Sequence, residues 1–344
     1  MAPLPVPPRE DFVDHALLAA SLEDLKTPHQ LSPVISALAR AAKSKLTIIL
    51  FSPLFGSSDA GISHTEEWHD VQRLLTYVYV QATKISRELD KLLMSVDVLL
   101  KGFHDKVGEE VGKGAERLYR VAGDKVDLPL PESILSLPQT WLPPGGAAYL
   151  HPDVHYHHIR TEAPKSEPST PLPPLYPVVA LGGTFDHLHA GHKILLSMAA
   201  WITRTKIIVG VTDDRLLVKK ANKEVIQDIT TRMSHVTAFL ALFRPGLEYE
   251  VVPIDDVYGP TAWDPDIQAL VLSKETLAGG VAIDKLRLEK DLPPLRTFVI
   301  DVISATEESL DHEDADLLKQ AKMSSTFIRE RLVKKRKASE EGGR

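Results

Sequence analysis

The chain has 344 residues, of which 43% are hydrophobic and 25% are charged, with a formal net charge of -7 and no cysteine. This length predicts two domains rather than one core, and the lack of cysteine excludes disulfides, thiolate catalysis and cysteine-bound zinc. The negative charge argues against general binding to nucleic acids or anionic membranes. The sequence shows neither a secretory signal peptide nor an apolar run of about 18 residues, so we expect a cytoplasmic protein.

Residues 1–139 are predicted to form an N-terminal α/β domain whose fold and role the sequence does not define. The run KLTIILFSP, residues 45–53, has the composition of a buried strand, and an amphipathic helix is expected at 65–91. A second strand is expected at 95–100, and this order of strand, helix and strand indicates an α/β unit. The glycine-rich GEEVGKG at 108–114 lacks the spacing of a phosphate loop, so we interpret it as a solvated turn.

Residues 140–177 are rich in proline, glycine and serine, which predicts an extended linker rather than a helix or a central strand. The linker holds four histidines, His151, His155, His157 and His158. They do not combine with carboxylates at helical spacing, so we interpret the cluster as part of a polar loop. We expect no metal site built from protein side chains.

Residues 178–337 are predicted to be a catalytic domain in which strands alternate with helices, followed by a disordered tail at 338–344. The predicted strands occupy 176–183, 206–212, 247–254, 266–273 and 296–303. The predicted helices occupy 191–204, 224–243, 277–288 and 324–337. This alternation indicates right-handed crossovers and a mostly parallel sheet, in which ligands bind at the carboxyl ends of the strands.

The motif GGTFDHLHAGH follows the first strand of this domain, where a ligand is expected. Its glycines allow a sharp turn and a close backbone approach, and Asp186 is placed to brace that turn. His189 and His192 flank Gly191 at the start of a helix, where unpaired N–H groups and partial positive charge suit phosphate. The histidine spacing is not the one that places two zinc ligands a helical turn apart, so a phosphate site is favoured over a metal site or a plain surface turn.

A second motif, KMSSTFIRERL, begins the last predicted helix. Ser324, Ser325 and Thr326 would present hydroxyl and N–H groups to phosphate at a helix start, although the same residues also make ordinary helix caps. The presence of both motifs, at opposite ends of one α/β domain, favours the phosphate interpretation.

Together the two motifs resemble those of the HxGH nucleotidyltransferase superfamily, which has a Rossmann-like domain. With VTDDRLLVKK, DDVYGPTAWDPD and LVLSKETLAGGVAIDKLR, residues 178 to 332 resemble the eukaryotic, fungal-like type of phosphopantetheine adenylyltransferase. The resemblance implies an enzyme of coenzyme A biosynthesis that transfers AMP from ATP to 4'-phosphopantetheine, giving dephospho-CoA and pyrophosphate. It implies no protein nucleophile, so catalysis would rest on positioning and charge stabilisation.

The resemblance also implies roles for single residues. His192 would donate to the α-phosphate as charge builds up, and His189 would hold the nucleotide phosphates. Thr184 would orient the attacking phosphate. Lys219 or Lys220 would neutralise both phosphates, and the alignment of this loop slightly favours Lys219.

Gly183 and Phe185 would line the nucleotide pocket through backbone and ring. The hydroxyl motif Ser324–Thr326 would hold the β- and γ-phosphates, with Arg329 nearby. Arg287 would reach the triphosphate, unless it lies on a solvated helix face. Mg²⁺ is expected to arrive with ATP rather than in a protein cage.

Tyr258 lies in the segment IDDVYGP, which is expected to shape a loop around the pantetheine arm or to serve structure alone. The segment SKET at 273–276 is expected either to shape a substrate pocket or to cap a helix.

Two alternatives remain open at this level: another HxGH nucleotidyltransferase, of the cytidylyl or nicotinamide-mononucleotide type, or a non-catalytic subunit or scaffold of a CoA-synthesising complex. Other enzymes of coenzyme A synthesis are then candidate partners. Nucleic acid and membrane are not expected. The basic run KKRK at 334–337 leaves nuclear import open, although a solvated helix end is favoured.

Overall fold

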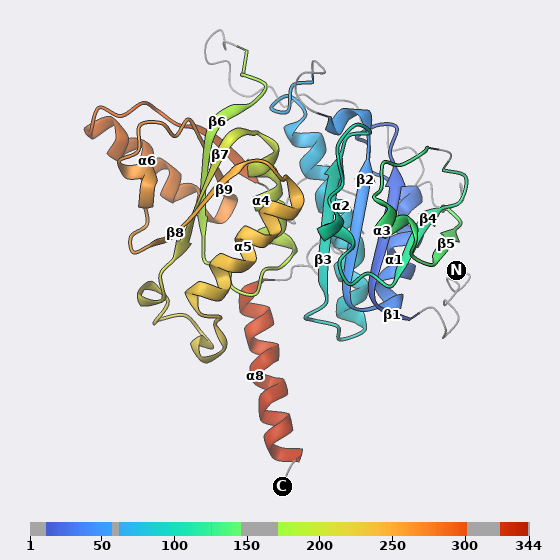
Figure 1. Cartoon of the computed structure of the whole chain (residues 1–344). Helices are drawn as coiled ribbons and strands as arrows, with labels where there is room; N and C mark the ends of the chain where they lie inside the picture. Colours follow the sequence, from blue (N-terminus) through green and yellow to red (C-terminus); the bar gives the residue numbers. More distant parts are fainter. Residues whose placement is uncertain (1–11, 57–61, 125, 146–170, 301–323, 343–344) are drawn as a thin grey trace, which may run out of the picture.

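A computed structural model describes residues 12–56, 62–124, 126–145, 171–300 and 324–342. Two α/β halves stand side by side, each built on a five-stranded parallel sheet with helices packed against it (Figure 1). The strand orders are β3-β2-β1-β4-β5 and β10-β9-β6-β7-β8. The predicted α/β class with a mostly parallel, Rossmann-like catalytic sheet is therefore confirmed, and the domain boundaries stay a prediction.

The N-terminal half contains the strands β1 (Val13–Ser21), β2 (Ala42–Phe51), β3 (Ser95–Lys101), β4 (Arg117–Val121) and β5 (Gln139–Leu142). Its helices are α1 (Ser32–Ala41), α2 (Trp68–Glu88) and α3 (Glu132–Leu135). The expected strand, helix and strand correspond to β2, α2 and β3. The expected turn at 108–114 contains a short 3-10 helix, η5 (Glu109–Gly112), whose Val111 is buried.

Two strands overlap the ends of the predicted linker. Thr140–Leu142 belong to β5 at the edge of the first sheet, and β6 of the second sheet already begins at Tyr176. The four linker histidines lie outside the described residues.

The C-terminal half contains the strands β6 (Tyr176–Gly183), β7 (Thr203–Thr212), β8 (Glu248–Ile254), β9 (Ala269–Ser273) and β10 (Arg296–Ile300). Its helices are α4 (Ala190–Trp201), α5 (Ile229–Phe243), α6 (Leu277–Glu289) and α8 (Ser325–Gly342). The chain passes from β6 to β7 in one direction and from β9 to β10 in the other, so the strand order reverses between β6 and β9. Such a switch point opens a ligand crevice at the carboxyl ends of the strands.

Several helix boundaries differ from the sequence prediction: α2 is shorter than expected at both ends, and α4 ends at Trp201 because β7 already begins at Thr203. Helix α5 begins at Ile229, later than expected, because Asp228 caps it by accepting the Thr231 N–H at 3.0 Å. Helix α8 continues to Gly342, so residues 338–342 are helical where a disordered tail was predicted. The last helix projects from the body of the molecule (Figure 1).

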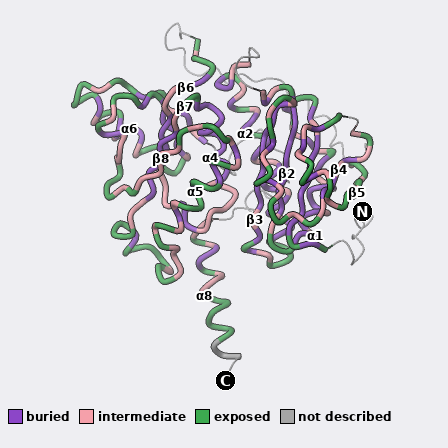
Figure 2. The backbone as a smooth tube through the Cα atoms, in the orientation of Figure 1, coloured by how far each residue is buried: buried purple, intermediate pink, exposed green. Residues whose placement is uncertain are grey.

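One continuous hydrophobic core joins the two halves, and Figure 2 shows buried backbone in both sheets and in the helices between them. Trp201, at the end of α4, stacks on His64 with ring centroids 3.8 Å apart, and its Nε1 donates to the His64 carbonyl at 2.8 Å. Trp68 of α2 packs on Phe298 of β10 at 4.9 Å. The halves therefore meet through packed aromatic groups rather than through a solvated surface.

We expect Trp201→Ala to lower the free energy of unfolding by about 3 to 5 kcal/mol, since it removes a buried indole and leaves a cavity between the halves. Urea unfolding followed by circular dichroism measures this loss. Trp263→Ala is the matched control, because Trp263 is 62% exposed and its removal should change stability by about 0.5 kcal/mol or less. Equal effects of the two substitutions would contradict the role of Trp201 at the interface.

Candidate active site

The turn that follows β6 is tight and unusual in its backbone. Phe185 and His187 both have positive φ, 51° and 45°, a region that bulky side chains rarely adopt. A Cβ on Gly183 would lie 3.2 Å from the Phe185 ring, so glycine lets that ring fold back under the strand end. Phe185 is fully buried and its ring lies 5.3 Å from that of His192, so it packs beside the histidine pair, and its place in a nucleotide pocket stays a prediction.

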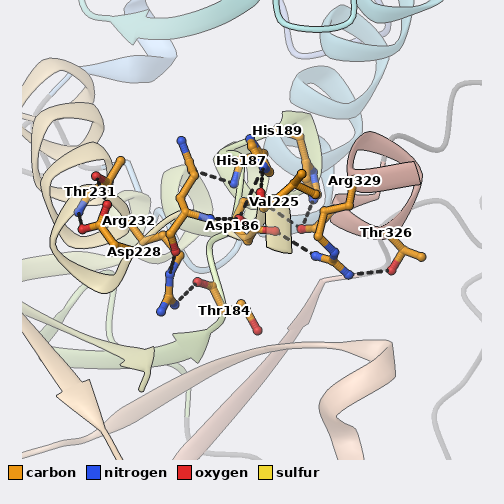
Figure 3. Close-up of polar contacts among 12 residues, drawn as sticks. Thr184, Asp186, His187, His189, Val225, Asp228, Thr231, Arg232, Thr326 and Arg329 are labelled. Carbon is orange, nitrogen blue, oxygen red and sulfur yellow. Dashed lines mark hydrogen bonds and ion pairs between the residues drawn. The ribbon is translucent and has the colours of Figure 1, made fainter. Parts of the chain in front are cut away.

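Asp186 fastens this turn to two other segments of the catalytic domain (Figure 3). Its fully buried carboxylate accepts the Gln227 N–H at 3.0 Å and forms an ion pair with Arg329 at 2.8 Å. Gln227 lies just before α5 and Arg329 lies in the first turns of α8. The predicted bracing role of Asp186 is therefore confirmed, and the brace reaches the second phosphate motif.

His189 and His192 stack on each other at the start of α4, with ring centroids 3.9 Å apart and an interplanar angle of 23°. Burial lowers the pKa of His189 to about 4 and that of His192 well below its usual value. Both rings are therefore neutral near pH 7, each with one donor and one acceptor nitrogen. Among the described residues, the buried Nδ1 of each ring has no hydrogen-bond partner. A phosphate oxygen would be a hydrogen-bond acceptor for a ring nitrogen that donates.

The start of α8 lies against this histidine pair. The Ser325 hydroxyl donates to the Asp186 carbonyl at 3.0 Å and lies 3.3 Å from His189 Nε2. Ser324 accepts the Phe327 N–H at 3.3 Å, as a helix cap does, and Thr326 accepts a hydrogen bond from Arg329 at 3.2 Å. The fold thus brings together two motifs that the sequence separates. Ser324 acts as a helix cap, and binding of phosphate by these hydroxyls stays a prediction.

A cation lies beside the strand end. Lys220 Nζ donates to the Thr184 hydroxyl at 3.3 Å, and burial followed by the nearby Arg329 charge lowers the pKa of this lysine. Lys219, which the sequence slightly favoured, and Lys220 are both exposed, and the contact with Thr184 is made by Lys220. The role of Lys219 stays a prediction.

Sequence reasoning missed Arg232, which ties the ends of two strands together beneath the site. Its fully buried guanidinium donates to the carbonyls of Thr184 and Thr212, both at 2.8 Å, and pairs with the Asp214 carboxylate. Arg232 also donates to Gln227 O at 2.9 Å. A signal was present, since an arginine inside the apolar helix ITTRMSHVTAFLALF needs buried partners.

Residues 180–331 match the cytidylyltransferase-like family. The phosphopantetheine adenylyltransferase of Saccharomyces cerevisiae is 46% identical over 157 residues, 46% of this chain and 48% of that protein. The phosphopantetheine adenylyltransferase of Pyrobaculum aerophilum is 32% identical over 151 residues, covering 44% of this chain and 88% of that protein. The chain belongs to the phosphopantetheine adenylyltransferase family. It spans about half the length of the yeast relative.

Arg287 lies on α6 and has structural contacts of its own. Helix α6 begins beside the end of β9, and at about 1.5 Å per residue Arg287 lies about 15 Å farther along the helix, away from the carboxyl ends of the strands. Its fully buried guanidinium donates at 2.7 to 2.9 Å to three carbonyls, those of Thr261, Asp264 and Pro293. These bonds hold a loop, and binding of the triphosphate by Arg287 stays a prediction.

The other family-based pocket residues have visible structural roles. Asp256 accepts the N–H groups of Tyr258 and Gly259 at 2.7 and 2.6 Å, which shapes the loop after β8. Ser273 and Thr276 form a capping box at the end of β9. Binding of substrate by Tyr258 stays a prediction for this member of the phosphopantetheine adenylyltransferase family.

The described residues contain no group of three or more His, Asp or Glu side chains arranged to hold a metal ion. None of the helices in the described part of the chain is long and apolar enough to cross a membrane.

We expect protonation of His189 to oppose folding, because its pKa is lowered from 6.5 to about 4 in the folded protein. The unfolded chain therefore binds this proton more tightly than the folded chain does. The contribution of neutral His189 to the free energy of unfolding is complete above about pH 6.5 and is lost as the pH falls below that value. At about pH 5 the loss amounts to about 2 kcal/mol. Urea unfolding at about pH 7.5 and about pH 5 should show a smaller drop for His189→Gln than for the wild type. Equal drops would contradict the lowered pKa.

Proposed function

We propose that the C-terminal half transfers AMP from ATP to 4'-phosphopantetheine, giving dephospho-CoA and pyrophosphate in coenzyme A biosynthesis. An oxygen of the pantetheine phosphate forms a bond to the α-phosphorus of ATP. The bond from that phosphorus to the bridging oxygen of the β-phosphate breaks, and pyrophosphate leaves with the electron pair. The observation that carries the proposal is the meeting of two helix starts at the end of β6, where Ser325 lies 3.3 Å from His189.

The histidines would act on the nucleotide as neutral donors. Negative charge builds up on the α-phosphate oxygens during the displacement, and preorganised donors at that point stabilise the transition state more than the bound substrate. His192 would donate to the α-phosphate and His189 to the neighbouring phosphates. Their lowered pKa values disfavour a role as proton carriers near pH 7.

Thr184 and Lys220 would hold the attacking phosphate. The Thr184 hydroxyl lies at the end of β6 in contact with the Lys220 ammonium group, so one hydroxyl and one cation meet where the acceptor must approach. Two phosphates that lie side by side repel each other, and the Lys220 ammonium group would supply the positive charge that offsets this repulsion. Correct orientation of the attacking oxygen is a second large catalytic effect. Gly183 and Phe185 would form the wall beneath the nucleotide.

The start of α8 would hold the β- and γ-phosphates through the hydroxyls of Ser324–Thr326 and the unpaired N–H groups of its first turn. Arg329 would support this helix through its ion pair with Asp186. Mg²⁺ would arrive bound to the ATP phosphates and would neutralise the charge of the leaving pyrophosphate. This fits a site whose central carboxylate, Asp186, is already committed to Arg329 and Gln227.

The direct test is to incubate the purified full chain with ATP, Mg²⁺ and 4'-phosphopantetheine and to measure dephospho-CoA and pyrophosphate. We expect both products in equal amounts. CTP in place of ATP, and phosphocholine or nicotinamide mononucleotide in place of the acceptor, test the other HxGH activities. Turnover only with one of these substrates would replace the proposal by another nucleotidyltransferase activity. A folded protein without turnover of any kind would favour the scaffold alternative.

We expect His192→Ala to lower kcat at least about 100-fold, the scale of losing one transition-state donor, with the fold unchanged. Steady-state kinetics and circular dichroism measure the two effects. His235→Ala is the matched control, because His235 lies on α5 outside the histidine pair. Activity of His192→Ala near that of the wild type would remove His192 from the mechanism.

The two lysines of the loop give a paired comparison. We expect Lys220→Ala to lower kcat/KM for 4'-phosphopantetheine by about 10- to 100-fold, since a charged hydrogen-bonding group is worth about 1.5 to 3 kcal/mol. Lys219→Ala should change it by less than about threefold, in keeping with a weakly interacting surface charge. The opposite order would restore the role that the sequence assigned to Lys219.

A further inference from the structure

The N-terminal half holds the start of α4, the helix that carries the histidine pair. Lys193 follows His192 directly, and its ammonium group lies 2.6 Å from Asp97 Oδ1, 2.8 Å from Val96 O and 3.0 Å from Ser95 Oγ. All three acceptors belong to the beginning of β3 in the other half of the chain. An ammonium group has three N–H donors, so this arrangement uses each of them and fixes the direction of the side chain.

The contact between Lys193 and Asp97 is buried, with exposed fractions of 4% and 6% for the two residues. Burial alone would raise the pKa of Asp97, but the charges of Lys193 and Lys45 outweigh it and hold this pKa below its usual value. The carboxylate is therefore ionised near pH 7. A buried ion pair with complete hydrogen bonding contributes little to net stability but strongly favours one geometry.

The N-terminal half also holds the start of α8, the helix that carries the hydroxyl motif. Asp90, just past the end of α2, accepts from Arg331 and Lys335 at 3.0 Å each. The Arg87 guanidinium lies over the Phe327 ring, 5.0 Å from its centroid. Each surface contact is weak alone, and together they link three successive turns of α8 to the end of α2.

A cavity of about 460 Å³ lies beside the first of these anchors, and Lys193 and Asp97 are part of its lining. Residues of both halves line it, among them Leu92, Met94, Leu188, His189, Phe239 and Ile328. Next to this cavity, the three polar contacts of Lys193 link the first turn of α4 directly to the N-terminal half.

We propose that the N-terminal half positions the two phosphate-binding motifs relative to each other. Asp97 would fix the start of α4 through Lys193, and Asp90 and Arg87 would fix the start of α8. These are positioning residues, since they act through His192 and Ser325 and do not touch substrate. The expected changes in kcat and KM rest on the proposed adenylyl transfer. The expected changes in the stability of α4 do not.

The first test is the double substitution Asp97→Leu with Lys193→Met, which replaces the buried pair by apolar side chains of similar size. Such replacements often leave stability unchanged, so the fold should persist. We expect kcat to fall about 10- to 100-fold, because small displacements of positioned groups have effects of this size, while KM for ATP stays within about threefold. The matched control is Asp14→Ala with Lys43→Ala, an exposed ion pair of the same half, which should keep wild-type kinetics.

The second test is Asp90→Ala, which removes an exposed side chain and does not threaten folding. We expect KM for ATP to rise about two- to fivefold with little change in kcat, since the phosphates held by α8 are affected. Asp90→Glu should restore most of this loss. A folded double variant and an Asp90→Ala variant that both show wild-type kinetics would overturn the inference.

Hydrogen exchange separates this inference from the proposed function. We expect the amides of α4 from Lys193 onward, which donate helical hydrogen bonds, to exchange at least about tenfold faster in the double variant than in the control, whatever reaction the protein catalyses. A wild-type chain without adenylyl transfer would end the proposed function, and the exchange result would still decide the positioning role. Unchanged exchange in α4 would overturn that role even in an active enzyme.

Discussion

The buried carboxylate of Asp186 is the interaction on which the site depends. It sits at the end of β6 and binds the segment before α5 through Gln227 and the helix α8 through Arg329. An unpaired charge at a fully buried position would be strongly unfavourable, so the carboxylate and the Arg329 guanidinium require each other. Through this pair the hydroxyl motif, distant in the sequence, is held beside the histidines.

Burial also determines the chemistry available to the site. Desolvation keeps the stacked rings of His189 and His192 neutral, whereas the cations at hand are Lys220, partly exposed, and Arg329, already paired. A site with neutral donors near the centre and positive charge at its edge suits phosphates that carry their own Mg²⁺. If His189 and His192 were protonated, their two charges at the centre of the site would carry a large desolvation penalty even before a ligand bound.

Local patterns predicted much of the catalytic half, and long-range contacts explain what they missed. The alternation of strands and helices, the turn braced by Asp186 and the pairing of two helix starts all follow from short motifs. The choice between Lys219 and Lys220 depends on the path of a loop, which no periodicity specifies. The structural contacts of Arg287 were not predictable from its motif, because a helix carries a side chain away from the strand end at which the helix begins and toward partners distant in the sequence.

Helix α4 shows that the two halves depend on each other. Every residue from Lys193 to Trp201 is buried, so this helix is apolar around its whole circumference, as expected for a helix covered on all sides. The sheet of the catalytic half covers one side and α2 of the N-terminal half covers another. Lys193 is the one charge in this run, and it points to Asp97 across the interface. The sequence of α4 therefore requires the N-terminal half, because without it an apolar face and an unpaired lysine would flank the proposed phosphate site.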